Sequence, residues 1–473
     1  MQMPPMTCAS CGCTSQPGTT FQCCSACRSV AYCGPSCQRA HWKDGHRGAC
    51  RDAAQKRYAS ALAAAEAGDA GAQFEVAVCL QYGLGAPKDQ RASVTWYKRA
   101  AEAGNAHAQS NLAVAYHKGF GGLQIDERVA ATWWRRAAEA GLPDAMHDIG
   151  ACYKEGRGVE LSTEKSVAWW RLAAEKGHAR SQAQLGLYYR DVVGSADGNR
   201  QAAVWFRRAA EGGDAMGQCE LGSCFREGVG VPADPVQAVV WWRRSAEGGH
   251  DKAQYNLGVA FLTGVGVAAD PSQAVAWLRR AADANNAPAQ LCLGMFYKNG
   301  HGVEADAAQA ATWLRRSAEG GVAEAQYRLA LCFHSGDGVP ADPAQAASWF
   351  SRAAVGGHTD AQYKAAFCFR TGSGVKVDIP RAIALLRLAA ATGHADSMHD
   401  LGCLYAQGEA GIPRDYAAAF AWFQRAAEKG HLESMFNVAV SYEKGNGVAA
   451  NAAKAAEWYH RTALAGLSSK SAS

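Results

Sequence analysis

Tryptophan recurs along most of this 473-residue chain at an almost constant interval. A chain of this length exceeds one ordinary hydrophobic core, so either several domains or a repeat array is expected. The interval of 36 or 37 residues predicts the array, and it divides the chain into eleven units, with Leu385 in the one vacancy. The tryptophans are Trp96, Trp133, Trp169, Trp205, Trp241, Trp277, Trp313, Trp349, Trp422 and Trp458.

Residues 253–285 show how one unit is expected to fold. Ala253, Leu257 and Phe261 recur at intervals of four residues, so they share one face of a predicted first helix. The segment Gly264–Gly266 then breaks this helix, because glycine tolerates the positive φ angles that a tight reversal requires.

A second helix is predicted after this loop. Asp270 can act as its N-cap, and Pro271 suits the first helical position, where a missing N–H costs nothing. Ala274, Trp277 and Ala281 form its apolar stripe. Glycine stops the second helix in sister repeats, at Gly104, Gly141, Gly177, Gly249, Gly357 and Gly430. The chain is therefore expected to be all-α, built from eleven helix–turn–helix repeats.

Small residues occupy one column of the first helix in every repeat. Glycine in a helix interior costs about 1 kcal/mol relative to Ala, so close approach of an adjacent helix is expected there. A single repeat cannot bury its own apolar face, and we expect this column to explain how neighbouring repeats stack. The column holds Gly150, Gly186, Gly222, Gly258, Gly294 and Gly402, with Ala77, Ala113, Ala330, Ala366 and Ala439 in the other repeats.

The units resemble the Sel-1-like repeat, a relative of the tetratricopeptide repeat. Residues 217–249 and 253–285 follow its pattern closely, with an AQ-x-x-LG helix, a G-x-G-V loop, a D-x-x-x-A-x-x-W helix and a final A-E-x-G or its equivalent. The loop departs from the pattern in the second repeat, GFGGLQID, and in the fourth, YYRDVVGSADGNRQ. The resemblance implies a right-handed α-solenoid that serves as a scaffold for protein complexes.

Cysteine is concentrated at the N-terminus, where nine of the 17 cysteines lie within the first 50 residues. The start of the chain shows no basic stretch followed by an apolar one, so no secretory signal is predicted, and metal ligation is favoured over disulfides. Zn²⁺ prefers four such ligands, so eight ligands predict two ions, which should supply much of the folding free energy of this short segment. The close pairs are Cys8-x2-Cys11, Cys24-x2-Cys27, Cys33-x3-Cys37 and His46-x3-Cys50.

The segment resembles the MYND finger, and the string YCGPSCQRAHWKDGH at residues 32–46 carries the resemblance. The family implies interleaved pairs, with Cys8, Cys11, Cys33 and Cys37 on one zinc and Cys24, Cys27, His46 and Cys50 on the other. Cys13 or Cys23 could replace a neighbouring ligand. The resemblance also implies binding of short proline-containing peptides by Gln38 and Trp42, although Trp42 could instead pack the zinc-bound core.

Charge and hydropathy limit the partners. Residues 1–57 hold seven Lys and Arg against two Asp, and this excess equals the net charge of +5 of the whole chain. The repeats are therefore neutral overall, so proteins and not nucleic acid are the expected partners. No apolar run approaches the roughly 20 residues of a membrane span. We expect an intracellular protein, cytoplasmic or nuclear, without a membrane partner.

Two polar columns on the first helices form what we call the polar stripe, because positions i and i+7 lie on one side of a helix. The stripe is either a ligand groove or simply the solvated side. Its first column is Glu75, Asn111, Asp148, Gln184, Glu220, Asn256, Cys292, Arg328, Lys364, Asp400 and Asn437. Its second column is Tyr82, Lys118, Glu155, Asp191, Glu227, Thr263, Asn299, Ser335, Thr371, Gln407 and Lys444.

Other recurring residues are interpreted as architecture. Cysteines in one column of the first helix are expected to be buried small apolar residues, since they occur once per repeat: Cys79, Cys152, Cys224, Cys332 and Cys368. Histidines recur between repeats, mostly after the helix-stopping glycine, whereas a catalytic residue is expected once: His107, His178, His250, His358, His394 and His431. We therefore predict a protein that is not an enzyme.

The predicted organisation is a MYND finger at 8–50, a linker and capping helix at 51–70, repeats at 71–466 and a disordered tail at 467–473. The predicted function is a zinc-binding adaptor, in which the finger binds peptide motifs and the solenoid binds other proteins. The alternative is a substrate-recruiting subunit of a ubiquitin ligase or of another modifying enzyme.

Overall fold

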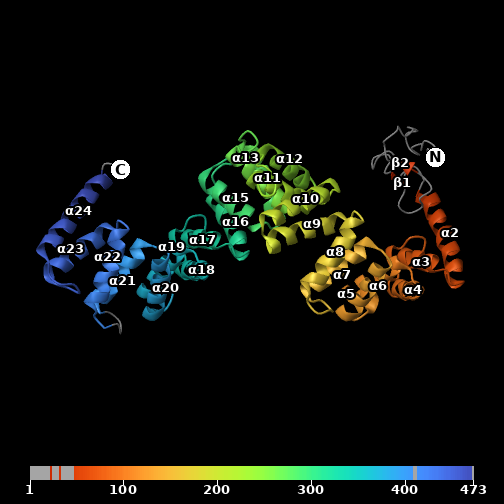
Figure 1. Cartoon of the computed structure of the whole chain (residues 1–473), viewed down its shortest axis with the longest axis horizontal. Coiled ribbons are helices and arrows are strands. Elements are labelled where there is room, and N and C mark those ends of the chain that lie inside the picture. The colour runs from red at the N-terminus through yellow and green to blue at the C-terminus, as the bar shows by residue number, and fades with distance from the viewer. Residues whose placement is uncertain (1–21, 24–30, 33–46, 409–412, 471–473) are drawn as a thin grey trace. The chain divides into compact units, whose positions relative to one another are not determined.

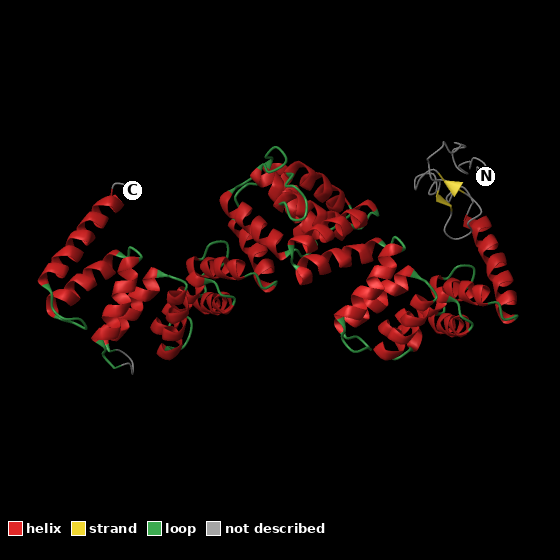
Figure 2. Ribbon diagram, in the orientation of Figure 1, coloured by secondary structure: helices red, strands yellow, loops and turns green. Residues whose placement is uncertain are grey.

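Figure 1 shows the computed structural model of the chain, which describes residues 22–23, 31–32, 47–408 and 413–470. Their regular secondary structure is helical apart from two short strands, β1 (Gln22–Cys23) and β2 (Ala31–Tyr32), which pair antiparallel, and loops connect the helices (Figure 2). Helix α2 (Arg47–Glu66) precedes eleven pairs of helices. The predicted all-helical solenoid of helix–turn–helix repeats is confirmed.

Each repeat contributes a first helix, here called helix A, and a second, helix B. The A helices are α3 (Ala70–Tyr82), α5 (Ala106–Lys118), α7 (Pro143–Glu155), α9 (Ala179–Tyr188), α11 (Ala215–Glu227), α13 (Asp251–Thr263), α15 (Ala287–Asn299), α17 (Ala323–Ser335), α19 (Thr359–Thr371), α21 (Ala395–Gln407) and α23 (Leu432–Lys444). The B helices are α4 (Gln90–Glu102), α6 (Glu127–Glu139), α8 (Thr163–Glu175), α10 (Ala196–Glu211), α12 (Pro235–Glu247), α14 (Pro271–Asp283), α16 (Ala307–Glu319), α18 (Pro343–Val355), α20 (Ile379–Ala391), α22 (Tyr416–Glu428) and α24 (Ala452–Lys470).

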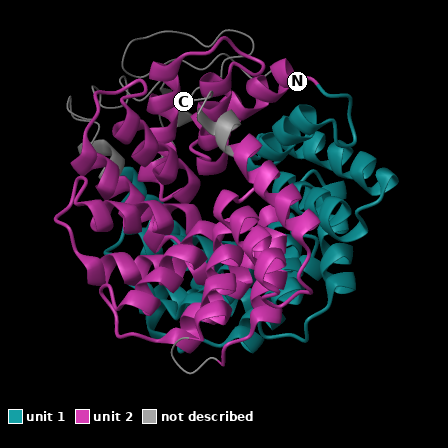
Figure 3. Ribbon diagram, turned by 90° about the vertical axis from the view of Figure 1, so that its left-hand side faces the viewer, with its two compact units in different colours: residues 1–233 teal, residues 234–473 magenta. Residues whose placement is uncertain are grey.

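The chain divides into two compact units, residues 1–233 and 234–473 (Figure 3). The division falls in the fifth repeat, after α11 and before α12. Within each unit, helix A packs on helix B of its own repeat, and helix B packs on helix A of the next. Helices in the interior of each unit therefore have a neighbour before and after them in the chain, as expected for a solenoid whose stability comes from nearest-neighbour contacts.

The predicted start and stop signals of the helices are confirmed in the sixth repeat. Gly264 ends α13 with φ of 72°, and its N–H donates to the Ala260 carbonyl. Asp270 then caps α14, because its carboxylate accepts the backbone N–H of Gln273 at 3.0 Å, and Pro271 is the first helical residue. A short polar side chain and two glycines are thus enough to define this reversal.

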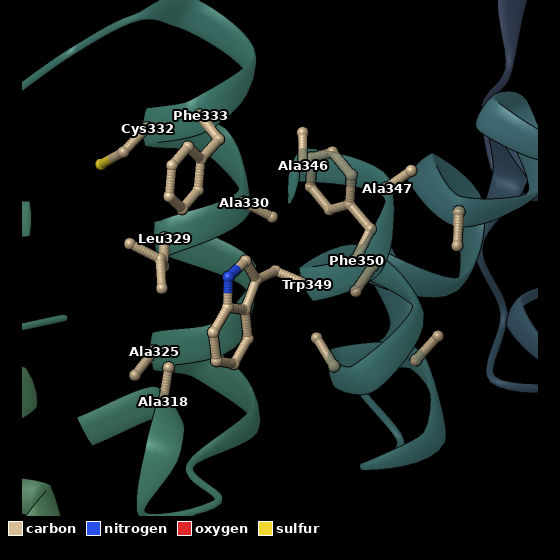
Figure 4. Packing of buried hydrophobic residues seen from close by; sticks show 14 of the residues in the cluster. Ala318, Ala325, Leu329, Ala330, Cys332, Phe333, Ala346, Ala347, Trp349 and Phe350 are labelled. Carbon is tan, nitrogen blue, oxygen red and sulfur yellow. The ribbon is translucent and has the colours of Figure 1, made fainter. Parts of the chain in front are cut away.

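The core of the eighth repeat shows how A and B helices share their apolar residues. In Figure 4, Leu329 and Phe333 of α17 lie opposite Trp349 and Phe350 of α18. Alanines fill the spaces between these large side chains, and all of these residues are buried. Burial of apolar surface at about 25 cal/mol per Å² provides the main stabilisation of such an interface.

The glycine column of helix A makes room within a repeat, whereas the sequence analysis assigned it to stacking between repeats. A Cβ atom at Gly150 would lie 2.5 Å from the indole nitrogen of Trp170, and one at Gly186 would lie 2.5 Å from the Phe206 ring. Both aromatic residues belong to helix B of the same repeat. The column therefore brings the two helices of one hairpin together.

The second glycine of the G-x-G loop is the small residue that allows neighbouring repeats to stack. A Cβ atom at Gly374 would lie 2.0 Å from the carbonyl oxygen of Pro343, which begins helix B of the preceding repeat. Gly266 meets Pro235 in the same way, at 2.1 Å. The contact is with backbone, so no rotamer change could relieve it.

The recurrent tryptophan carries a guanidinium group on its ring face. In α14, Cζ of Arg280 lies 4.5 Å from the ring centroid of Trp277. The same stack, from residue i to i+3, recurs in most B helices, and Leu172 and Leu388 replace the arginine in the third and ninth repeats. These cation–π pairs cover the half-buried indole ring while the charge stays at the surface.

The structure adds three details to the predicted boundaries and loops. Helix α2 begins at Arg47, so the boundary predicted between residues 50 and 51 falls inside a helix. Helix α24 continues to Lys470, into the predicted tail, whose last residues 471–473 lie outside the described part. The two atypical loops form a 3-10 turn at Phe120–Gly122 and a π-helical turn at Tyr189–Val193.

Candidate functional site

The predicted zinc ligands and the peptide-binding residues Gln38 and Trp42 lie outside the residues whose side chains the structure describes. In their region, the structure describes the pairing of Gln22 with Tyr32 and of Cys23 with Ala31 in β1 and β2. The eight-ligand set and the interleaved pairing therefore remain predictions.

The polar stripe lies on the A helices, apart from Asp191 in the π-helical turn after α9, and most of its first column is half-buried. Glu220 is only 4% exposed, and Lys364 is one of the exposed members. Burial of a charged residue is costly unless it is paired, so pairing partners are expected along the stripe.

Cations near the end of one A helix pair with the stripe residue of the next. Lys154 Nζ lies 3.4 Å from Oε1 of Gln184, Arg190 forms an ion pair with Glu220, and Arg370 lies 3.6 Å from the Asp400 carboxylate. Each of these contacts spans 30 residues, so they connect neighbouring repeats. Three residues of the first column are therefore paired with cations of the preceding repeat.

Two carboxylates of the stripe are held in a poorly solvated position. Burial raises the pKa of Asp148 to about 6, and nearby Asp144 adds to this effect. Burial likewise raises the pKa of Asp400, although Arg370 opposes the shift. Both groups ionise less readily than exposed carboxylates because desolvation disfavours the charged form.

A cavity of about 240 Å³ opens on the stripe at the first two repeats. Gln81 and Tyr97 line it together with the stripe residues Asn111 and Lys118. The Tyr97 hydroxyl lies 2.5 Å from the Oε1 atom of Gln81, and burial is the main reason that its pKa rises to about 12. The cavity therefore offers amide, hydroxyl and ammonium groups to a polar ligand.

The predicted cysteine column of helix A is free and buried, as expected for small apolar residues: Cys79, Cys152, Cys224, Cys332 and Cys368. Burial raises the pKa of Cys152 to about 12 and that of Cys224 to about 11. A thiol with such a pKa is rarely ionised at neutral pH, and the thiolate is the reactive form. This column is therefore structural.

The histidines between repeats have a defined structural role. Nδ1 of His358 accepts the backbone N–H of Ala361 and caps α19, while its Nε2 lies 2.8 Å from a Glu324 carboxylate oxygen of the preceding repeat. The cap recurs at His178, His250, His394 and His431. Each of these side chains caps the N-terminus of a helix. Most of them also contact a carboxylate of the preceding repeat.

The glutamine of the AQ motif also connects repeats, a role that the sequence analysis missed. Nε2 of Gln290 donates to the carbonyl of Ala282, 3.0 Å away, near the end of the preceding B helix. The same bond forms in eight repeats, and Met146, Met398 and Met435 replace the glutamine in the others. A buried polar residue at a fixed repeat position was the available signal, because such residues need partners.

A second group that the sequence analysis missed lies between α21 and α23. His399, His431 and Glu433 place one potential ligand atom each within 4.8 Å of one another. The available signal was His399 itself, since its helical position carries no histidine in most repeats and His147 is its counterpart in the third.

Comparison with known proteins agrees with this architecture. The Sel1 repeat model matches eleven consecutive segments between residues 70 and 467, and the MYND finger model matches residues 8–50. No curated protein sequence matches the chain. No helix among the described residues has both the length and the apolar character that crossing a bilayer requires.

Two solved structures illustrate the similarity. The protective antigen c5321 of uropathogenic Escherichia coli, which displays an SLR fold, is 31% identical, with 86% of each chain covered and a TM-score of 0.65. A Sel1 repeat protein from Oxalobacter formigenes is also 31% identical, with 65% of this chain and 90% of the other covered and a TM-score of 0.47. With eleven matched repeats over most of its length, the chain belongs to the Sel1 repeat family.

Proposed function

We propose that this protein is an adaptor that binds different proteins through its finger and its repeats. The observation that carries the proposal is the joining of two modules: a finger model matched at residues 8–50 and eleven repeats that present equivalent side chains on successive A helices. Repeat arrays of this kind offer extended surfaces, which suit protein partners more than small substrates.

The finger, residues 8–50, is proposed to hold two Zn²⁺ ions. The matched segment contains all eight proposed ligands, Cys8, Cys11, Cys24, Cys27, Cys33, Cys37, His46 and Cys50. Thiolate and imidazole groups are the donors that structural zinc sites use. Gln38 and Trp42 are proposed to bind proline-containing peptides next to this metal-stabilised core.

The polar stripe is proposed as the protein-binding surface of the repeats, residues 71–466. Its most available part is the cavity at Asn111 and Lys118, together with the exposed Lys364, since several other members are paired within the chain. Glu220 is a poor probe of this surface because it is buried and paired with Arg190.

Affinity capture tests whether the finger and the repeats bind different proteins. The full chain is compared with a Cys24→Ala, Cys27→Ala variant and with a matched Cys332→Ala, Cys368→Ala variant, whose cysteines lie in the repeats. Partners of the finger should be lost from the first variant alone. An Asn111→Ala, Lys118→Ala, Lys364→Ala variant should lose the other partners. If all three variants capture the same proteins as the unchanged chain, the proposal is wrong.

A role as a substrate-recruiting subunit of a ubiquitin ligase or another modifying enzyme is the second candidate. It is supported by the same two protein-binding modules, which could hold a substrate and an enzyme together. Ubiquitin transfer to captured partners, measured with and without the Cys24→Ala, Cys27→Ala variant, distinguishes it from a passive adaptor. We propose an intracellular location, cytoplasmic or nuclear.

A further inference from the structure

The junction between the tenth and eleventh repeats gathers several metal-binding side chains at one point. His399 of α21 and His431, the N-cap of α23, stack with ring centroids 4.5 Å apart and an interplanar angle of 28°. Nε2 of His399 lies 3.4 Å from Oε2 of Glu433 and 3.4 Å from Sγ of Cys403. Four side chains from two parts of the sequence, α21 and the start of α23, therefore lie close together.

These separations approach those of a zinc site. Ligand atoms about 2.0–2.3 Å from a tetrahedral zinc ion lie about 3.3–3.8 Å from one another. The two contacts of His399 Nε2 already fall in this range, and the ligand atoms of His399, His431 and Glu433 all lie within 4.8 Å. Glu433 is 79% exposed on its side chain, so its carboxylate can adjust without disturbing the core.

The surroundings prepare His399 for this role. Its Nδ1 lies 2.9 Å from Oγ of Ser434, which can accept a hydrogen bond from an N–H at Nδ1 and so leave the lone pair on Nε2. Its side chain is only 14% exposed, so the ring is held in place by its neighbours. A metal ion binds the neutral form of an imidazole, through the nitrogen that carries no proton.

We propose that His399, His431, Glu433 and Cys403 form a binding site for one Zn²⁺ ion within the repeat array, separate from the ions of the finger. Two imidazoles, a carboxylate and a thiolate together form a donor set that zinc accepts.

Zinc binding changes the hydrogen bonds of His431. In the metal-free protein its Nδ1 accepts the backbone N–H of Ser434 at 3.2 Å, and its Nε2 faces Asp396 at 3.4 Å. On binding, Nε2 contacts the metal, and the ring proton moves to Nδ1, which donates to Oγ of Ser434, 3.1 Å away. Cys403 releases its thiol proton to solvent, and the His431 ring gives up a proton at Nε2 and takes one up at Nδ1, so one proton is released for each zinc ion bound. Zinc binding therefore removes the hydrogen bond by which His431 caps α23 and replaces it with a bond between Nε2 and the metal ion.

The junction between the third and fourth repeats supplies an internal control. His147 and His178 are the counterparts of His399 and His431, with ring centroids 5.1 Å apart, and both also contact the hydroxyl of Ser181. Arg180 stands there in place of Glu433, and Ala151 in place of Cys403. This histidine pair thus lacks counterparts of Glu433 and Cys403 and has the cation Arg180 beside it instead, which disfavours a metal ion.

Zinc content of the full chain tests the proposal. Unchanged protein, a Cys403→Ala, Glu433→Arg variant and the reverse Ala151→Cys, Arg180→Glu variant are saturated with ZnCl2, freed of loose metal by gel filtration and analysed by atomic emission. We expect the first variant to hold one zinc fewer per chain and the reverse variant one more. Zinc ions in the finger contribute equally to all three proteins, so they do not affect the differences in zinc content.

Equal zinc content in the unchanged protein and the Cys403→Ala, Glu433→Arg variant would overturn the proposal. The third and fourth repeats carry the same two residues at the matching positions, and circular dichroism checks that this variant folds. A Cys403→Ser variant loaded with Co²⁺ tests the thiolate: we expect part of the thiolate-to-cobalt absorption to disappear relative to unchanged protein. An undiminished band would remove Cys403 from the ligand set.

Discussion

Contacts inside a repeat and contacts between repeats use different chemistry in this protein. Inside a repeat, Gly186 makes room for the Phe206 ring, and Arg280 stacks on Trp277. Between repeats, Gly374 lies against the Pro343 backbone, and a glutamine or histidine bonds to the preceding repeat. Side chains can repack, whereas backbone contacts and buried polar bonds have few alternatives. The contacts between repeats should therefore be the less tolerant of substitution.

The largest effect is expected at the loop glycine. Gly374→Ala would place Cβ 2.0 Å from the Pro343 carbonyl oxygen at φ of 72°, and we expect a loss of about 3 kcal/mol or more in the free energy of unfolding. Urea unfolding followed by circular dichroism measures it. Gly357→Ala is the control, since Gly357 also has positive φ but meets nothing within 4 Å, and it should lose only about 1 kcal/mol.

The histidine pair between the third and fourth repeats should make that junction sensitive to acid. Burial, with His178 and Arg180 nearby, lowers the pKa of His147 to about 4 from 6.5, so the folded state holds this ring neutral. The contribution of the neutral ring to the free energy of unfolding is fully present above pH 6.5 and is lost as the pH falls toward 4. This change is on the order of 1–3 kcal/mol. His147→Gln should make the urea midpoint of unfolding depend less on pH over this range. His301→Gln, at an exposed loop position, should leave that dependence unchanged.

A glycine inside helix A should be less critical than the loop glycine. Gly186→Ala brings Cβ to 2.5 Å from the Phe206 ring, but the ring can shift, because the eighth repeat accommodates Ala330 with Phe350 at the matching positions. We expect a loss of about 1–2 kcal/mol, partly offset by the better helix propensity of alanine. A loss in urea unfolding equal to that of Gly374→Ala would contradict the proposed difference.

Removing one glutamine tie between repeats should have a moderate effect. In Gln290→Met the Ala282 carbonyl loses its side-chain donor, and we expect a loss of about 1 kcal/mol, because methionine fills the same space without donating. Gln309→Met, at an exposed position of helix B, should change urea unfolding little. Equal effects of the two substitutions would mean that this bond contributes nothing between repeats.

The smallest effect is expected for the surface stack on tryptophan. Arg280→Ala removes a guanidinium 4.5 Å from the Trp277 ring and should cost about 0.5 kcal/mol in urea unfolding. The third repeat lacks this stack, because Leu172 stands there three residues after Trp169, where other repeats have arginine. A loss above about 2 kcal/mol would show that contacts inside a repeat matter more than we propose.

The sequence predicted the repeats, the caps and the buried cysteines because each depends on local spacing. It misassigned the glycine column because periodicity shows that a close contact is needed but not which neighbour makes it. It missed the Gln290 bond and the group around His399 for a related reason: their partners lie in the preceding or following repeat. The two atypical loops, at Phe120–Gly122 and Tyr189–Val193, follow no family pattern and required the structure. The finger ligands remain predictions from the sequence.

The substitution of methionine for the AQ glutamine has a consequence for how the array opens. Met398 and Met435 stand in its last two repeats, so the ends of α20 and α22 receive no amide donor there. Opening of a linear array begins where a neighbour is held least firmly. Amide hydrogen exchange should therefore be fastest in the C-terminal repeats and slower toward the interior of the array. A zinc ion bound at His399 would slow the opening of that end, and its removal would restore the opening.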